Sequence, residues 1–87
     1  MKKAHFHKKF RKKYIKLTRK LQEQTDKRIG LFLMSPDDPQ VNNHQLKGKY
    51  EGYWSINVTG DYRAVYKELN DDEVEFFDVD NHSNLYS

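Results

Sequence analysis

The sequence contains no cysteine and no long apolar stretch, and each shortage excludes a class of protein. Without cysteine the chain forms no disulfide and offers zinc no thiolate, which fits a reducing compartment. The longest uninterrupted apolar run is Leu31 to Met34, far shorter than a membrane span or the apolar region of a signal peptide. We therefore expect a cytoplasmic protein that does not enter a membrane.

Proline is also scarce, and the only two prolines both lie within the segment 35–39. No repeat or Gly/Ser-rich linker divides the chain. The 87 residues therefore suit a single domain, residues 1–87, with one thin core. A chain this short encloses no deep cavity, so any active site should be a surface groove. The hydrophobic fraction is only 36%, but twelve aromatic residues supply large apolar areas for the core.

Charge is distributed unevenly along the sequence. Residues 1–28 contain twelve Lys and Arg against two acidic residues, or +10, whereas residues 29–87 contain four against eleven, or −7. A basic segment of this kind attracts polyanions through phosphate contacts and counterion release, so RNA, DNA or an acidic protein is an expected partner. The alternative is a solvated, lysine-rich helix surface without a partner. Both interpretations predict that these lysines are exposed.

The first half of the chain is predicted to be helical. Apolar side chains recur there at the three- and four-residue spacing of a helix. They are Phe10, Tyr14, Leu17, Leu21, Ile29, Phe32 and Leu33. Thr18 is a candidate N-cap, which favours a short helix of about ten residues followed by a longer one. The opening segment Lys2–Phe6 has no helical face and is predicted to be an edge strand.

After the prolines the period of the pattern changes to two. Polar and apolar residues alternate at 55–58 before the turn signal 59–61, and a return strand is predicted at 62–67. A second turn leads into a third strand at 74–79. Helices followed by a three-stranded antiparallel meander predict an α+β domain, with the helical pair on one face of the sheet. We expect the functional site on the other, open face.

Few residues indicate a chemistry by their spacing alone. The four histidines, at positions 5, 7, 44 and 82, form no metal-binding motif, and neither a glycine-rich phosphate loop nor a recognisable nucleophile is present. No metal and no cofactor are therefore expected. Tyr50, Tyr53 and Trp54 form an aromatic cluster that can stack on RNA bases. In a protein of this size, however, such residues more often belong to the core or contact a partner protein, and we favour that interpretation.

Four ordered blocks carry a resemblance to a known family. They are the proline break Ser35–Pro39, the segment His44-x-Leu46-x-Gly48, the segment Gly60-Asp61-Tyr62-Arg63-x-x-Tyr66 and the ending His82-x-x-Leu85-Tyr86. In this order they resemble the RelE superfamily of bacterial toxins, and most closely its YafQ-type branch. The resemblance spans nearly the whole chain. It implies a RelE-like α+β fold, in which an N-terminal edge strand and a two-helix hairpin pack on a small antiparallel sheet.

The resemblance also implies an activity. Toxins of this family are metal-independent endoribonucleases that cut mRNA, usually on the ribosome, and are silenced by a cognate antitoxin. The 2′-hydroxyl of the RNA is the nucleophile, so the chemistry requires a general base, a general acid and positive charge facing the phosphate. The partners implied are the antitoxin, mRNA and the ribosome, with operator DNA bound only through the antitoxin.

Individual positions of the family pattern imply roles for residues of this chain. His44, Asp61 and His82 match the acid–base residues of YafQ-type toxins, and Arg63 matches the phosphate-facing arginine of the wider superfamily. Imidazole and carboxylate suit proton transfer near neutral pH, and the planar guanidinium matches two phosphate oxygens. Tyr86 matches a terminal aromatic that can stack on a base. The expected RNA contacts are Arg63, Tyr86, Asn57, Lys47, Lys8 and Lys12.

Two positions depart from the family pattern. Asn57 stands where YafQ-type toxins have a second catalytic histidine, and an amide donates a hydrogen bond but does not exchange a proton near pH 7. Asp80 and Asn81 replace the usual Gly-Thr before the terminal histidine, which adds negative charge beside the site. Either the remaining acid–base residues carry the reaction or the enzyme is weak.

Structural roles and other functions remain open beside this interpretation. Asp61 suits a turn, and Arg63 suits a cross-strand ion pair with Glu75 or Asp78. A catalytically weak or inactive member would act mainly by binding an antitoxin and, with it, operator DNA. A gyrase poison of the related ParE branch would keep the fold without the histidines, and the histidines at positions 44 and 82 argue against it.

Overall fold

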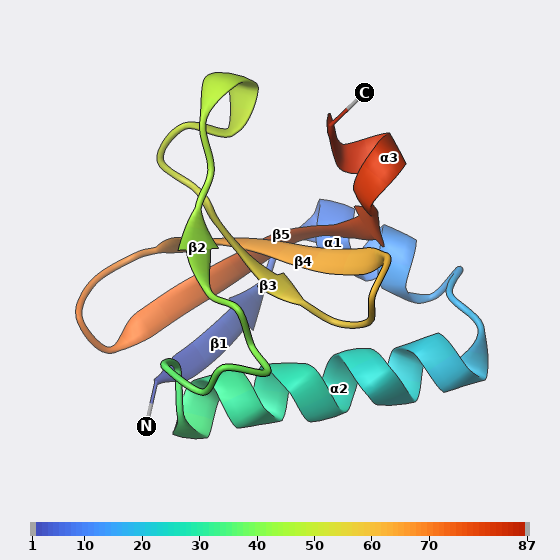
Figure 1. Ribbon diagram of the computed structural model, residues 1–87, viewed down its shortest axis with the longest axis horizontal. Coiled ribbons are helices and arrows are strands. Elements are labelled where there is room, and N and C mark those ends of the chain that lie inside the picture. The colour runs from blue at the N-terminus through green and yellow to red at the C-terminus, as the bar shows by residue number, and fades with distance from the viewer. Residues whose placement is uncertain (1, 87) are drawn as a thin grey trace.

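The computed structural model describes the backbone of residues 2–86 and the side chains of residues 2–85. A five-stranded sheet in the order β1-β5-β4-β3-β2 forms its centre, and one long helix lies across a face of the sheet (Figure 1). The strands are β1 (Lys3–Phe6), β2 (His44–Gln45), β3 (Trp54–Asn57), β4 (Tyr62–Glu68) and β5 (Glu73–Asn81). The helices are α1 (Lys8–Tyr14), α2 (Arg19–Met34) and α3 (His82–Tyr86), with a 3-10 turn at Gly48–Tyr50. The predicted α+β class is confirmed.

The two N-terminal helices begin at side-chain caps. Thr18 precedes α2, and its Oγ1 accepts a hydrogen bond from the backbone N–H of Leu21 at 3.2 Å. His7 precedes α1, and its Nδ1 accepts one from the N–H of Lys9 at 3.0 Å. Each cap satisfies an N–H group that has no partner within its own helix. The predicted division at Thr18 into a short and a long helix is therefore confirmed.

The predicted meander is present as β3, β4 and β5, which pair antiparallel in chain order. The N-terminal strand lies at the edge as predicted, but β1 runs parallel to β5, so the sheet is mixed. The register of β4 and β5 shifts where Val65 pairs with Asp78 and Tyr66 pairs with Phe76. Such a bulge adds a residue to one strand. Phe76 consequently enters the core beside Tyr66, while Asp78 lies on the opposite face with Val65.

The main core lies between α2 and the sheet. Ile29 and Phe32 of α2 are 6% and 0% exposed and pack on strand residues that point toward the helix. Those strand residues are Ile56, Ala64, Tyr66, Val74, Phe76 and Val79. The ring centroids of Phe32, Tyr66 and Phe76 lie 4.7 to 5.9 Å apart. Because burial of a phenylalanine side chain contributes about 2–3 kcal/mol, this cluster fixes α2 on the sheet.

Helix α1 follows β1 directly and packs beside β5 at the edge of the sheet. Its residue Phe10 contacts Phe76 in the core, with ring centroids 5.9 Å apart. About one turn further along the helix, Lys13 reaches Asp78, with 3.0 Å between Nζ and Oδ1. The sequence predicted both helices on one face, whereas the structure places α1 at the edge, where it contacts groups on both faces.

The face of the sheet opposite α2 is only partly open. A small apolar cluster of Leu46, Val65 and Leu85 covers its middle, and Tyr50 and Tyr53 pack against it. The loop between β2 and β3 and the helix α3 both project from this face, away from α2 (Figure 1). The expectation of a fully open face is therefore corrected. Any site on this face must lie beside the cover.

Candidate active site

A surface hollow of about 270 Å³ lies beside this cover. Its lining residues are Asn42, His44, Leu46, Arg63 and His82. Strand β2 supplies His44, strand β4 supplies Arg63, and helix α3 begins at His82. Three of the four side chains expected to be catalytic therefore meet in one place, although the first and the last of them are 38 positions apart along the chain.

His44 is held in a defined tautomer. Its Nδ1 lies 2.7 Å from the backbone carbonyl oxygen of Asn42. A carbonyl only accepts, so Nδ1 must donate and carries a hydrogen, which leaves the lone pair of a neutral ring on Nε2. Asn42 has a φ of 49°, in the left-handed region that asparagine tolerates better than most residues. This turn brings its carbonyl to the ring and makes Nε2 the nitrogen that can accept a proton.

The guanidinium of Arg63 is anchored at one end. Its Nη1 donates to the backbone carbonyls of Thr59, Gly60 and Tyr62, at 3.0, 3.1 and 3.2 Å. The N–H groups on Nε and Nη2 have no hydrogen-bond partner within the described part of the chain. Since Arg63 also lines the hollow, these groups are available to an anion there.

The ion pair considered for Arg63 does not form. Glu75 lies 3.8 Å from the Nζ of Lys67, and Asp78 pairs with Lys13. Both carboxylates that could have neutralised Arg63 are thus engaged by lysines.

His82 and Asp61 meet through their backbones. The N–H of His82 donates to the carbonyl oxygen of Asp61 at 2.8 Å, which ties the first residue of α3 to the turn between β3 and β4. The N–H of Asp61 donates to Oγ1 of Thr59 at 3.2 Å, as in a side-chain-stabilised turn. The carboxylate of Asp61 is exposed and does not line the hollow. Asp61 therefore holds His82 in place through its main chain.

The two residues before His82 fix the orientation of α3. Oδ1 of Asn81 accepts from the N–H of Asn84 at 2.8 Å, and Oδ1 of Asp80 accepts from Nδ2 of Asn84 at 3.0 Å. Oδ2 of Asp80 lies 2.9 Å from Nζ of Lys13. The negative charge that departs from the family pattern thus faces a lysine. Sequence reasoning missed this arrangement.

Charge and hydrogen bonds keep Asp80 ionised. Burial alone would raise its pKa, but the hydrogen bonds from Lys13, Asn84 and the backbone N–H of Asn81 lower it below the usual value. Burial alone would likewise lower the pKa of Lys13, but its contacts with Asp80 and Asp78 raise it. The pair is therefore charged on both sides across the neutral range.

Asn57 and Ser55 lie on β3 with side chains toward the same face as the hollow, but neither lines it. Asn57 pairs with Arg63 in the strand register, and Ser55 pairs with His44. The Oδ1 of Asn57 and the Oγ of Ser55 are buried and have no hydrogen-bond partner among the residues that the structure describes. Asn57, where the family resemblance implies a histidine, is therefore half-buried next to Arg63 with its Oδ1 atom buried.

The other expected RNA contacts lie outside the hollow. Lys47 is exposed in a neighbouring depression of about 240 Å³, which Leu46 also borders. Lys8 and Lys12 are exposed on α1, as predicted for the basic segment. The stacking role expected for Tyr86 falls on a side chain outside the described residues.

Within residues 2–86, no group of three or more His, Cys, Asp or Glu side chains is placed to hold a metal ion. The polar side chains that line the hollow are two imidazoles, a guanidinium and an amide. This set can transfer protons and bind an anion. No helix in the same range is long and apolar enough to cross a bilayer.

Comparison with known proteins identifies the family. Residues 2–87 match the model of the YafQ bacterial toxin of type II toxin–antitoxin systems. No curated protein matches the chain. Among solved structures, YafQ from Escherichia coli BL21(DE3) is 21% identical with a TM-score of 0.78 over all of both chains. The toxin of the E. coli DinJ–YafQ complex is 22% identical with a TM-score of 0.76, again over all of both chains.

A second toxin type has the same fold. The YoeB/ParE toxin from Agrobacterium tumefaciens is 22% identical with a TM-score of 0.74, over 94% of this chain and 99% of that one. These likenesses establish the fold, and the match to the family model covers almost the entire sequence. The chain therefore belongs to the YafQ family of bacterial toxins of type II toxin–antitoxin systems.

Proposed function

We propose that this toxin is an endoribonuclease that cleaves mRNA without a metal ion, by attack of the RNA 2′-hydroxyl on the adjacent phosphate. The convergence of His44, Arg63 and His82 on one hollow carries the proposal. The three side chains come from separate elements, so their meeting is a property of the fold. They supply the acid–base groups and the positive charge that this reaction requires.

His44 is the general base of the proposed reaction. Its Nδ1 hydrogen is committed to the carbonyl of Asn42, so Nε2 takes the proton from the 2′-hydroxyl. The 2′-oxygen then forms a bond to phosphorus while the bond to the 5′-oxygen breaks. His82, in its protonated form, gives a proton to that leaving oxygen. The products are a 2′,3′-cyclic phosphate and a 5′-hydroxyl.

Arg63 stabilises the charge that develops on the phosphate. Its Nη1 is anchored on turn carbonyls, which fixes the plane of the guanidinium before RNA binds. Preorganised donors of this kind lower the barrier because they need not reorient during the reaction. Asn57 lies beside Arg63 and transfers no proton, so the acid–base work falls on the two histidines.

The partners follow from the family and from the charge of the chain. The DinJ–YafQ complex is a toxin bound to its antitoxin, and we infer that this chain likewise has an antitoxin, through which it is held on operator DNA. The exposed basic residues of α1 fit contact with ribosomal RNA during mRNA cleavage.

The proposal is tested by inducing the chain in a bacterial host and mapping RNA ends. We expect growth arrest and new mRNA fragments ending in 2′,3′-cyclic phosphates. His44→Ala and His82→Ala should each reduce cleavage by about a hundredfold or more. His5→Gln is the matched control, because His5 lies on β1 outside the hollow. Intact messages during growth arrest would refute the proposal, and accumulated DNA breaks would then indicate gyrase poisoning.

A further inference from the structure

The loop between α2 and β2, residues 35–43, runs back along α2 before it rises into β2 (Figure 1). Its end determines the state of the candidate active site, because the carbonyl of Asn42 accepts from Nδ1 of His44 at 2.7 Å. Asn42 itself is exposed, and its φ of 49° lies in the left-handed region, which costs a residue with a side chain free energy. Contacts on either side of Asn42 must therefore hold this turn.

The residue before Asn42 is anchored in the core. Val41 is 0% exposed, and its carbonyl accepts from the N–H of Asn57 on β3 at 2.9 Å. Arg28 of α2 adds a second anchor, because its Nη1 donates to the carbonyl of Gln40 and, at 3.0 Å, to the carbonyl of Asn57. The chain that enters the turn is thus tied to both α2 and β3.

The residue after Asn42 is held by a tyrosine of the core. The hydroxyl of Tyr66 on β4 donates to Oδ1 of Asn43 at 2.6 Å. Tyr66 is 3% exposed, and burial raises the pKa of its hydroxyl far above the usual value, so the group stays protonated and can donate. Its ring packs against Phe32 and Phe76, with centroids 4.7 and 5.4 Å away. The side chain of Asn43 is thereby attached to the main core.

The peptide between Asn42 and Asn43 connects this anchor to the candidate active site. The carbonyl of Asn42 and the N–H of Asn43 belong to one planar unit, so a fixed Asn43 limits the rotation of that carbonyl. Side chains alternate along a strand, and His44, which begins β2 directly after Asn43, lies on the opposite face of the sheet. A hydrogen bond on the core face thus bears on an imidazole on the other face.

We propose that Tyr66 and Asn43 are positioning residues for the general base His44. Their hydrogen bond holds the Asn42 carbonyl where it keeps the hydrogen of the neutral imidazole on Nδ1, which leaves the lone pair of Nε2 available to the 2′-hydroxyl. Neither positioning residue lines the hollow. The inference deepens the proposed function and rests on His44 as the base of that reaction. The alternative is that Asn43 only satisfies a buried hydroxyl, without effect on the imidazole.

The tautomer of His44 can be measured without RNA. Long-range nitrogen–proton correlation spectra of the labelled toxin distinguish the two neutral tautomers at a pH where the ring is uncharged, and His44→Gln identifies the signals. The wild type should carry the hydrogen on Nδ1. Tyr66→Phe removes only the hydroxyl, and Asn43→Ala removes its acceptor. Each variant should therefore give a mixture in which part of the population carries the hydrogen on Nε2.

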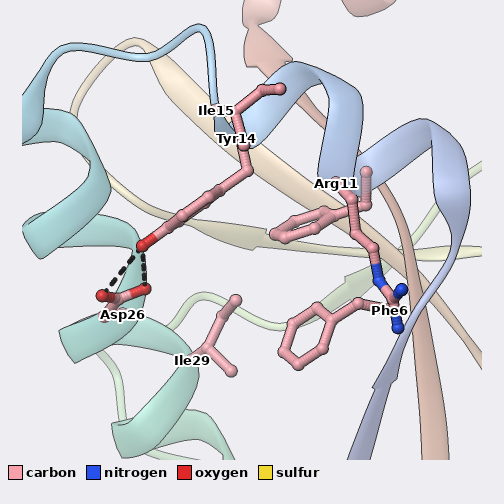
Figure 2. Close-up of a pocket in the computed structure, with 7 residues that line it drawn as sticks. Phe6, Arg11, Tyr14, Ile15, Asp26 and Ile29 are labelled. Atoms are coloured by element: carbon pink, nitrogen blue, oxygen red, sulfur yellow. Dashed lines mark hydrogen bonds between the residues drawn. The ribbon is translucent and has the colours of Figure 1, made fainter.

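Tyr14→Phe is the matched control, because it also removes one tyrosine hydroxyl that joins two elements. The hydroxyl of Tyr14 on α1 donates to the carboxylate of Asp26 on α2, with 2.8 Å to Oδ1 and 3.0 Å to Oδ2 (Figure 2). Both residues line a separate hollow of about 380 Å³, which shares no lining residue with the candidate active site. Urea denaturation compares the stability that each variant loses. The control should keep the tautomer of the wild type, and an equal change in Tyr14→Phe would assign the effect to general loosening and overturn the inference.

Cleavage of a model RNA gives the second measurement. We expect kcat of Tyr66→Phe and Asn43→Ala to fall about two- to tenfold, in step with the fraction of His44 that has lost the hydrogen on Nδ1, while KM stays nearly unchanged. The double variant should be no slower than the slower single variant, because both changes remove the same hydrogen bond. Fully additive losses would contradict a shared action.

The tautomer keeps this inference separate from the proposed function. An unchanged tautomer in both Tyr66→Phe and Asn43→Ala would overturn the inference, whatever happens to cleavage. A wild-type imidazole with its hydrogen on Nε2 would overturn it as well. A wild-type chain that cleaves no RNA, yet changes its His44 tautomer in both variants, would refute only the nuclease.

Discussion

Nζ of Lys13 on α1 lies 2.9 Å from Oδ2 of Asp80, at the end of the strand that leads into α3. The same ammonium lies 3.0 Å from Oδ1 of Asp78, whose side chain is only 1% exposed. One lysine thus joins the N-terminal helix to the strand that delivers His82 to the candidate active site. The basic segment of the chain has a structural role here as well as any role in binding partners.

Replacing Lys13 should destabilise the fold. Lys13→Met keeps much of the aliphatic stem but removes the charge, so the buried carboxylate of Asp78 keeps only Lys9 as a cationic partner. Loss of a hydrogen bond to a buried charged group costs about 1–3 kcal/mol of unfolding free energy. Urea denaturation followed by circular dichroism measures this. Lys12→Met, on the exposed side of the same helix, should change the unfolding free energy little, and an equal loss in both would exclude the ion pair as the cause.

The contribution of the Lys13–Asp80 pair should depend on pH in a defined direction. The pKa of Asp80 is lowered in the fold, so its stabilisation is present above the ordinary value of 3.8 and is lost as pH falls through the lower folded value. The pKa of Lys13 is raised, so its stabilisation is present below 10.5 and is lost as pH rises through the higher folded value. The difference in unfolding free energy between wild type and Asp80→Asn should therefore be largest between these limits. A difference that does not shrink in acid would contradict the assignment.

Much of the fold was predictable because its signals are local. The helical spacing around Phe10 and Tyr14, the cap at Thr18 and the alternation in β3 each lie within a few residues of the element they specify. Strand β2 has two residues and α3 has five, too few for either period to be visible. The parallel pairing of β1 with β5 and the cover formed by Leu46 and Leu85 depend on contacts between distant segments.

The candidate site was likewise predictable from the sequence only in part. Sequence blocks indicated His44, Arg63 and His82, and the structure brings them together. The pairing of Lys13 with Asp80 joins residues 67 positions apart, in a chain with many other lysines and carboxylates. No local pattern selects this pair among the alternatives. The carbonyl of Asn42, which sets the tautomer of His44, was missed because any residue has a carbonyl and only the turn aims it.

Helix α3 should require Asn84 for its orientation. Asn84 binds both Asn81 and Asp80, so Asn84→Ala removes the side-chain link to Asp80 while the helix keeps its backbone. We expect kcat for RNA cleavage to fall by about three- to tenfold with KM nearly unchanged, because His82 is displaced and substrate contacts remain. Steady-state cleavage of a model RNA measures both constants. Ser83→Ala, at an exposed neighbouring position, is the control, and a rise in KM alone would place Asn84 in substrate binding.

Restoring a histidine at Asn57 should raise activity. Asn57 lies opposite Arg63 in the strand register, at a position where the family resemblance implies a proton-transfer group, and its buried Oδ1 has no hydrogen-bond partner among the described residues. Asn57→His adds a group that exchanges a proton near neutral pH, and a general acid or base contributes about a hundredfold or more when well placed. We expect at least about a tenfold faster single-turnover cleavage, allowing for imperfect placement. Asn57→Gln keeps an amide and should not accelerate the reaction. If the histidine variant is folded but no faster, then His44 and His82 already complete the acid–base set, and the buried amide is a structural feature of this chain.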